Sequence, residues 1–326
     1  MPPEAREQAD KGKNDMTGGQ KRKLIIIAGP TGVGKSDLAV TLSQRIGGEV
    51  ISADSMQVYR GMDIGTAKMT TEEMAGIRHH LIDVCDPGED WSVVRFQQMA
   101  KEVLTGIYDR GHIPVLCGGT GFYIQALLYD IDFTRNDDDG SFRKELETRA
   151  ELGEGPALYE ELKKVDPGAA EAIHPNNTRR VIRALEFYRQ TGLMISDHNR
   201  EQKERPSAFD SRFFVITDSR DRLYERTDRR VDRMLEAGLA DDVRALREKG
   251  YDRSLVSMQG LGYKEILSWL EGEISYEEAV RILKRDTRHF AKRQLTWFRR
   301  EQDVIWISRE DYPDDEKILE KMISCL

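Results

Sequence analysis

The feature that most constrains the fold is the octet Gly-Pro-Thr-Gly-Val-Gly-Lys-Ser at residues 29–36. An apolar, β-branched run precedes it at residues 24–28, and a segment typical of a helix start follows at residues 37–42. The spacing Gly-x-x-x-x-Gly-Lys-Ser between a strand and a helix predicts a P-loop, whose backbone N–H groups and helix N-terminus bind phosphate. The residues predicted to bind it are Gly29, Pro30, Thr31, Gly32, Val33, Gly34, Lys35 and Ser36.

Two side chains of this loop have chemistry of their own. Lys35 supplies a positive charge for phosphate oxygens, and the Ser36 hydroxyl is a ligand for Mg²⁺. Such loops are typical of ATP-binding and other nucleotide-binding proteins, so the loop alone favours a kinase of a small metabolite. It does not identify the phosphate compound, which the rest of the chain must decide.

Composition narrows the class of protein. The 326 residues allow a core domain and a second lobe, at roughly 150 residues per domain. No apolar run approaches the roughly 20 residues of a membrane span, so we expect no membrane association. The net charge of −8 argues against a protein that coats nucleic acid, although a local basic groove remains compatible with it. The three cysteines form no C-x-x-C pair, which favours a reducing, cytoplasmic location without disulfides or zinc.

Strands alternate with helices after the P-loop. Strands are predicted at residues 49–52, 80–84 and 113–117, and a helix at 92–109. This alternation predicts an α/β fold with a parallel sheet covered by helices on both faces. Ligands of such sheets bind beyond the carboxyl ends of the strands. Asp54 and Thr120 each follow a strand end, so we expect them to lie near the P-loop.

The helix at residues 92–109 is predicted to bury one apolar face. The residues assigned to that face are Val94, Met99, Val103 and Ile107.

The chain divides into a core and an insertion. Residues 1–22 are polar and charged and predict a disordered leader. Residues 134–204 contain no convincing strand and predict a helical insertion. Residues 23–133 and 205–326 then form the core, with further strands at 213–217 and 304–307 and helices at 221–249 and 278–300.

Two stretches are rich in arginine. In the helix at 278–300, five basic side chains share one face and an apolar stripe occupies another. Such a face either contacts RNA phosphates or is an ordinary solvated surface. In the helix at 221–249, Arg226 and Arg230 share a face that can reach the phosphate site. The five basic residues are Arg281, Lys284, Arg285, Arg288 and Lys292.

Five longer stretches resemble the signatures of tRNA dimethylallyltransferases, also called tRNA isopentenyltransferases. Together with the P-loop they run in order from about residue 23 to residue 307, and they are far more specific than the P-loop. The chain ends without the C2H2 zinc-finger extension of the eukaryotic members, so a bacterial type is expected. The stretches are residues 52–68, 118–123, 174–180, 261–265 and 286–299.

The resemblance implies a reaction. Members transfer a dimethylallyl group from dimethylallyl pyrophosphate to the exocyclic amine, N6, of the adenosine 3′ of the anticodon in tRNA. The P-loop then holds the pyrophosphate leaving group, with Mg²⁺ near Ser36 and with Lys35 and Arg230 stabilising the departing charge. Asp54 matches the family's general base, and Thr120 matches the residue that holds the bridging oxygen.

The resemblance also implies the macromolecular partner, the anticodon stem-loop of tRNA. Phosphate contacts are expected from the insertion and from the helix at 281–293, and base contacts from the loops around the site. We expect a monomer. The residues implied to contact tRNA are Asp54, Ser55, Met56, Gln57, Thr120, Arg143, Arg179, Arg180, Val181, Ile182, Arg183, Gln259, Gly260, Leu261, Gly262, Tyr263 and Lys264.

Two other functions compete with this interpretation. A metabolite kinase needs an acidic residue at the end of an apolar strand, and Asp83 is the one candidate. It also needs an arginine-rich lid, which the sequence does not offer. A non-catalytic RNA-binding module has no need for a P-loop beside an acid and a Gly-Gly-Thr loop.

Overall fold

The computed structural model describes residues 21–133 and 140–326. The predicted leader lies almost wholly outside the described residues, as does the start of the predicted insertion. The described chain forms two compact units, residues 128–207 and the rest.

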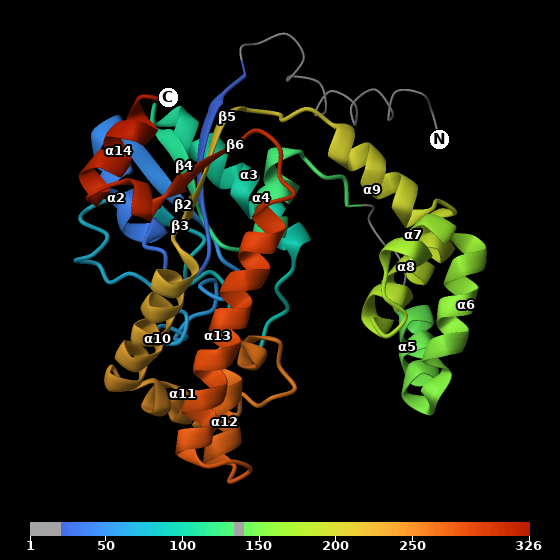
Figure 1. The fold of residues 1–326 in the computed structure, drawn as a ribbon. Coiled ribbons are helices and arrows are strands. Elements are labelled where there is room, and N and C mark those ends of the chain that lie inside the picture. Colours follow the sequence, from blue (N-terminus) through green and yellow to red (C-terminus); the bar gives the residue numbers. More distant parts are fainter. Residues whose placement is uncertain (1–20, 134–139) are drawn as a thin grey trace. The chain divides into compact units, whose positions relative to one another are not determined.

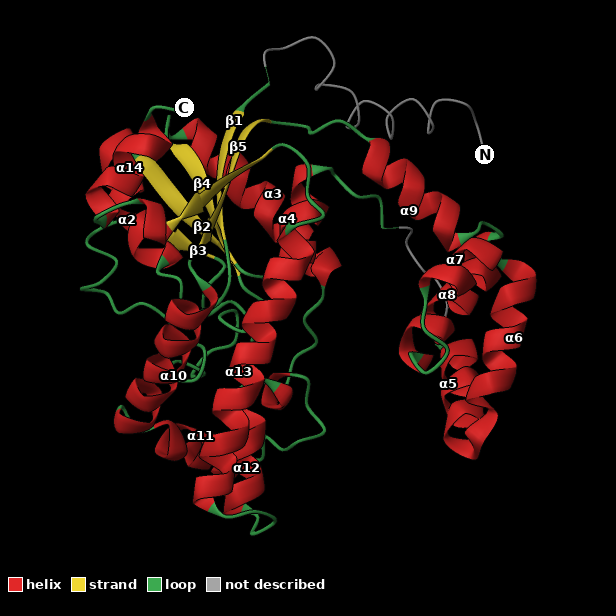
Figure 2. Ribbon diagram, in the orientation of Figure 1, coloured by secondary structure: helices red, strands yellow, loops and turns green. Residues whose placement is uncertain are grey.

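The larger unit is built on a six-stranded parallel sheet (Figures 1 and 2). The strand order is β3-β2-β4-β1-β5-β6, which confirms the predicted α/β class. The central strands are almost fully buried, as expected when helices cover both faces. The strands are β1 Lys23–Ala28, β2 Gly48–Ala53, β3 His79–His80, β4 Ile113–Gly118, β5 Asp210–Thr217 and β6 Val304–Ser308.

The register of the sheet brings three loops together. Ala28 at the end of β1 is paired with Gly118 at the end of β4, and Gly118 is paired with Ala53 at the end of β2. The three strands therefore end at the same level. The P-loop, the segment after Ala53 and the segment after Gly118 leave the sheet side by side.

Helices cover both faces of the sheet and extend beyond its carboxyl edge (Figure 1). α2 and α14 lie on one face, and α3 and α4 on the other. α10 to α13 lie beyond the edge and enclose a second apolar core that includes Tyr59, Met62 and Tyr263. The helices are α2 Lys35–Ile46, α3 Val93–Asp109, α4 Gly121–Leu128, α10 Arg220–Glu236, α11 Leu239–Glu248, α12 Tyr263–Leu270, α13 Tyr276–Phe298 and α14 Asp315–Ile323, with short helices η2 Ser257–Gln259 and η3 Arg309–Asp311.

Several sequence predictions are wrong in detail. The strand predicted at 80–84 ends at His80, because Leu81 and Asp83 adopt positive φ angles of 60° and 55°. The N–H groups of Val84 and Cys85 donate to the carbonyl of Val58 instead of continuing the sheet. The helix predicted at 221–249 is divided at Gly238, where φ is 96°.

The prediction of the buried face of α3 is also wrong in part. Val94 is exposed and Met99 and Val103 are only half-buried, whereas Ile107 is buried as predicted. The face that packs on the core is formed by Phe96, Gln97, Ala100, Leu104 and Ile107.

Residues 128–207 form a helical unit with its own core. Leu158, Leu162 and Val181 are completely buried there. Asp166 is also fully buried, and its carboxylate accepts hydrogen bonds from the N–H of Ala169 and from the N–H and hydroxyl of Ser196. The helices are α5 Ser141–Arg149, η1 Ala150–Glu154, α6 Gly155–Val165, α7 Pro167–Ala172, α8 Thr178–Thr191 and α9 Ile195–Glu204.

None of the helices within the described ranges has the length and hydrophobicity needed to cross a membrane.

A buried carboxylate of the sheet is surrounded by cationic and imidazole side chains. The side chain of Glu49, on β2, is only 4% exposed and binds Arg110 at 2.8 and 2.7 Å, His80 at 2.6 Å and His112 at 2.6 Å. The hydrogen bonds from Arg110 are the main cause that lowers the pKa of Glu49 from 4.5 to about 2. This carboxylate therefore stabilises the fold at neutral pH.

Glu49→Gln is expected to lower the free energy of unfolding by about 2 kcal/mol at neutral pH. Because the folded-state pKa is depressed, the contribution is complete above pH 4.5 and is lost as the pH falls toward 2. Urea unfolding at several pH values measures it, with Glu316→Gln in an exposed ion pair as the control. An equal difference between variant and parent at all pH values would contradict the ion-pair explanation.

Candidate active site

A cavity of about 350 Å³ lies at the carboxyl edge of the sheet. It is lined by the P-loop, by the segment after β2, by α10 and α13, and by the residues that precede α12. Lys35, Ser36, Asp54 and Arg230 all contribute to its wall. The structure thus brings together four side chains that the sequence predicted to act together.

The P-loop places Lys35 at the start of α2. Gly34 precedes it with φ of 83°, a left-handed conformation that glycine adopts without strain. The Lys35 Nζ lies 3.3 Å from the carbonyl oxygen of Pro30 within the same loop. Burial lowers the pKa of Lys35, and the charge of Arg230 lowers it further, whereas Asp54 opposes the shift.

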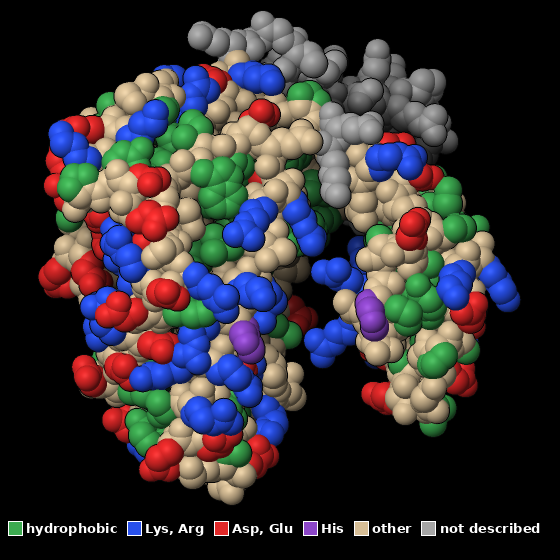
Figure 3. Space-filling view, viewed as in Figure 1, with side chains coloured by type: hydrophobic (Ala, Val, Ile, Leu, Met, Phe, Trp, Pro, Cys, Tyr) green, Lys and Arg blue, Asp and Glu red, His purple; other side chains and the backbone are tan. Residues whose placement is uncertain are grey.

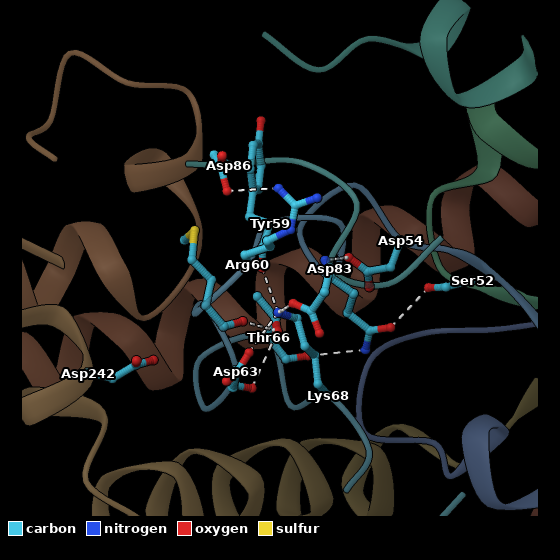
Figure 4. A network of polar contacts seen from close by, with 12 residues as sticks. Ser52, Asp54, Tyr59, Arg60, Asp63, Thr66, Lys68, Asp83, Asp86 and Asp242 are labelled. Atoms are coloured by element: carbon cyan, nitrogen blue, oxygen red, sulfur yellow. Dashed lines mark hydrogen bonds and ion pairs between the residues drawn. The ribbon is translucent and has the colours of Figure 1, made fainter. Parts of the chain in front are cut away.

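Asp54 follows β2 and caps the turn after it (Figure 4). Its Oδ1 accepts hydrogen bonds from the N–H of Met56 at 2.8 Å and of Gln57 at 3.4 Å. Its Oδ2 accepts no hydrogen bond from any residue that the structure describes. One oxygen therefore orients the carboxylate, and the other is available to take a proton.

Thr120 links the loop after β4 to the loop that carries Asp54. Its hydroxyl oxygen accepts a hydrogen bond from the N–H of Ser55 at 3.2 Å, and its own N–H donates to the carbonyl of Ala53 at 3.1 Å. A hydroxyl that accepts one hydrogen bond still has a proton to donate. Thr120 can therefore donate to a ligand oxygen beside Asp54.

Arg230 reaches the cavity from α10. Its Nη2 donates to the carbonyl of Thr66 at 3.2 Å, which fixes the guanidinium against the segment after β2. Burial lowers the pKa of Arg230, and the nearby Asp54 opposes that shift. Arg226, one turn earlier, does not line the cavity; its Nε donates to the carbonyl of Gly32 at 2.9 Å.

Gln294 on α13 ties the P-loop to the loop after β4, and sequence analysis missed it. Its Oε1 accepts from the N–H of Thr31 at 2.8 Å, and its Nε2 donates to the carbonyl of Gly119 at 3.0 Å. A Cβ on Gly119 would lie 2.1 Å from that Nε2, so any larger residue there would displace the Gln294 amide. Gln294 is only 6% exposed. A polar residue on the apolar, core-facing side of this helix was the one sign in the sequence that it has a specific partner.

Lys68 holds the segment between β2 and β3 in place and was also missed (Figure 4). Its ammonium group donates to the carboxylates of Asp63 and Asp83 and to the carbonyl of Tyr59. The Lys68 side chain is only 5% exposed. Asp83 is thus occupied by Lys68 and does not line the cavity, which removes the one kinase-type acid that the sequence offered.

Comparison with known proteins supports one family. The model of the IPP transferase family matches residues 57–301, and that of isopentenyl transferase matches residues 22–86. A tRNA dimethylallyltransferase of Lachnoclostridium phytofermentans is 58% identical over 93% of this chain and 97% of its own length. The chain belongs to the tRNA dimethylallyltransferase family. This confirms the resemblance found in the sequence.

Solved structures of the family are also similar to this chain. A tRNA isopentenylpyrophosphate transferase of Bacillus halodurans is 47% identical and matches with a TM-score of 0.70, covering 94% of this chain and 96% of that one. A eukaryotic dimethylallyltransferase, whose structures follow it acting on tRNA, is 33% identical with a TM-score of 0.78. That match covers 93% of this chain and 80% of the eukaryotic one.

The predicted tRNA contacts of the larger unit divide into two groups. Most of them line the cavity, namely Asp54, Ser55, Met56, Gln57, Gln259, Gly260, Leu261 and Lys264. Thr120, Gly262 and Tyr263 are not among the residues that line it; Tyr263 is fully buried, and its hydroxyl donates to Asp242 at 3.1 Å. Tyr263 is therefore a packing residue in the adjoining apolar core, and Gly262 directly precedes α12.

The predicted contacts of the helical unit also divide. Arg179, Arg180 and Arg183 are exposed at the start of α8. Val181 and Ile182 face the core of the unit, with 0% and 4% exposure, so their side chains do not reach a ligand. They pack the helix that presents the arginines against the core of the unit. Arg143, on α5, forms an ion pair with Glu147 at 3.1 Å.

The basic face predicted on α13 is largely neutralised. Lys284 and Arg288 pair with Asp232 and Asp228 of α10, at 2.6 and 2.7 Å. Arg281 and Arg285 pair with acidic neighbours on α13 itself. Lys284 and Arg288 therefore join α13 to α10, whereas the pairs of Arg281 and Arg285 stay within α13. That this face contacts RNA phosphates stays a prediction. Lysine and arginine side chains still gather on the surface over α13 (Figure 3), and Arg293 lines the cavity.

Proposed function

We propose that this chain transfers the dimethylallyl group of dimethylallyl pyrophosphate to N6 of the adenosine 3′ of the anticodon in tRNA. The observation that carries the proposal is the free Oδ2 of Asp54 in the same cavity as the P-loop Lys35. Membership of the family supports the same reaction.

The residues divide the reaction between them. The bond between C1 of the dimethylallyl group and the pyrophosphate oxygen breaks, and its electron pair leaves with the pyrophosphate. A new bond joins C1 to N6 of the adenosine, and the N6 proton passes to Oδ2 of Asp54. An aromatic amine is a weak nucleophile, so a base placed beside it speeds the step.

The cavity also suits the leaving group. We expect the pyrophosphate to bind against the P-loop N–H groups, Lys35 and Arg230, which would stabilise the negative charge that grows as the C–O bond breaks. The Thr120 hydroxyl is expected to donate a hydrogen bond to the bridging oxygen. Apolar side chains of the cavity, among them Met69, Ile82 and Met234, accept the five-carbon chain.

Mg²⁺ fits the donor set. Mg²⁺ is usually held by one or two protein oxygens together with substrate phosphates and water, and not by an all-protein cage. The described residues contain no group of three or more His, Cys, Asp or Glu side chains that could hold a metal. Ser36 lines the cavity and is the residue that would bind the ion beside the pyrophosphate. When bound, Mg²⁺ neutralises the charge of the leaving group.

The tRNA anticodon stem-loop is the second substrate. Its target base is stacked in the loop and must turn out of the stack to reach Asp54. Arg179, Arg180 and Arg183 of the helical unit are the proposed phosphate contacts, which position the stem. We propose that the protein acts as a monomer in the cytoplasm, where its substrate tRNA is found.

Incubation with labelled dimethylallyl pyrophosphate, Mg²⁺ and bulk tRNA, followed by nucleoside analysis, tests the proposal. Labelled N6-dimethylallyl adenosine is the expected product. ATP consumption with a small metabolite would support the kinase instead. Binding of tRNA without any labelled product would support a non-catalytic module.

The acceptor is expected to depend on its neighbours. Stem-loops with adenosine on both sides of the target should react about ten-fold faster than those with cytidine there, because lost base contacts leave polar groups unpaired. Rates measured on synthetic stem-loops that differ only at these bases test this. Equal rates would show that the enzyme does not read the flanking bases.

A further inference from the structure

Two arginines hold the outer side of the P-loop, and neither lines the cavity. Arg226 of α10 donates from Nε to the carbonyl of Gly32 at 2.9 Å. Arg309, in the short helix after β6, donates from Nε to the carbonyl of Val33 at 2.6 Å. Two consecutive P-loop carbonyls thus each receive a hydrogen bond from a cationic side chain, and such bonds are roughly twice as strong as neutral ones.

Because the peptide bond is planar, these two contacts also fix the direction of the neighbouring N–H groups. In a trans peptide the C=O and the following N–H point in opposite directions. A Gly32 carbonyl that points to Arg226 turns the N–H of Val33 away from it, and a Val33 carbonyl that points to Arg309 does the same for Gly34. Within residues 21–133 and 140–326, neither of these N–H groups donates a hydrogen bond. Both are therefore available to an anion on the opposite side of the loop.

Gly34 shows how closely the arginines approach. A Cβ at Gly34 would lie 2.7 Å from Nη2 of Arg309 and 3.0 Å from Nη2 of Arg226. The two guanidinium groups therefore occupy the space behind the P-loop. Burial lowers the pKa of Arg226, and the charge of Arg309 lowers it further.

The two arginines differ in their charge balance. Arg309 forms an ion pair with Asp315 of α14, at 2.5 and 3.0 Å, so much of its charge is neutralised. Arg226 forms no ion pair with any residue that the structure describes. Arg226 thus supplies a net positive charge behind the loop, whereas Arg309 mainly fixes its shape.

We propose that Arg226 and Arg309 are positioning residues that fix the P-loop N–H groups in the orientation that binds the pyrophosphate of the prenyl donor. This inference rests on the proposed function for the identity of the donor. It adds two residues, from the segments after the helical unit, to the requirements of the site.

The test measures binding of inorganic pyrophosphate with Mg²⁺ to the full-length protein by calorimetry. Arg226→Met and Arg309→Met are each expected to weaken pyrophosphate binding about ten-fold, as the loss of a charge-assisted hydrogen bond predicts. KM for dimethylallyl pyrophosphate should rise in parallel, and tRNA affinity should stay unchanged. Arg226→Lys, which keeps the charge but not the geometry, should fall between parent and Arg226→Met.

Matched controls separate positioning from stability. Arg229→Met removes an exposed arginine from the same helix, where it pairs with Glu225, and should bind pyrophosphate like the parent. Asp315→Asn removes the ion pair of Arg309 but keeps its bond to Val33, so binding should be nearly unchanged. Both arginine variants binding as tightly as Arg229→Met would overturn the proposal. An equal loss in Asp315→Asn and Arg309→Met would overturn it for Arg309.

The two proposals can fail separately. If the parent binds pyrophosphate but transfers no dimethylallyl group, the proposed function fails and the arginine comparison still decides the positioning role. If the parent does not bind pyrophosphate, the positioning role fails as well. If Arg309→Met does not fold, Arg226→Met decides the outcome, because Arg226 lacks an ion partner among the described residues.

Discussion

Asp54→Asn is expected to lower the rate of prenyl transfer by about 10²–10⁴-fold, the usual contribution of a general base. Asparagine has nearly the same shape and keeps an oxygen that accepts from the N–H groups of Met56 and Gln57. It cannot take the proton of the adenosine amine. Single-turnover transfer from labelled donor to a tRNA stem-loop measures the loss.

The substitution also distinguishes catalysis from structure. If Asp54 is purely structural, the variant should have a lower melting temperature and near-normal turnover. If Asp54 is the general base, the variant should keep its melting temperature and lose turnover. Pyrophosphate binding should remain close to that of the parent. Asp86→Asn, in an exposed ion pair with Arg60, is the control for loss of a carboxylate.

Lys35→Met is expected to reduce kcat/KM for dimethylallyl pyrophosphate by about 10²–10³-fold. The variant lacks one positive charge that stabilises the leaving group. The methionine retains most of the side-chain volume, so the fold should persist. Steady-state kinetics with the donor varied at saturating tRNA give the value. Lys317→Met removes a lysine from an exposed pair with Glu320 and should leave kinetics unchanged.

The affinity for tRNA provides the decisive control for Lys35. Lys35 lies at the start of α2 within the P-loop, and none of the residues expected to contact tRNA belongs to that loop, although most of them line the same cavity. Filter binding of tRNA should therefore give the same dissociation constant for parent and variant. A parallel loss of tRNA affinity would show that the P-loop serves both substrates.

The sequence was sufficient to predict the parallel sheet, most of its strands and the side chains at its edge. The P-loop spacing and the apolar runs at 24–28 and 113–117 define strands by local pattern alone, and Asp54 and Thr120 follow strand ends directly. Parallel strands end at one edge, so proximity followed from topology. These features depend on short segments whose residues determine their own conformation.

Other features depend on distant contacts and were missed. The buried face of α3 cannot be read from its apolar residues, because Val94 is exposed and Gln97 is buried. Gln294 contacts residues 31 and 119, and Arg309 contacts Val33, across most of the chain. The acids that neutralise Lys284 and Arg288 lie on α10, so helical spacing within α13 could not reveal them.

The strand order has a consequence for synthesis on the ribosome. β1 lies between β4 and β5, and residues 128–207 are made after β4 and before β5. While those residues emerge, β1 has a partner on one side only. The groups that hold Thr31, Gly32 and Val33 belong to residues 294, 226 and 309 and appear later still. A nascent chain therefore carries the complete P-loop sequence long before it can hold the loop in its finished form.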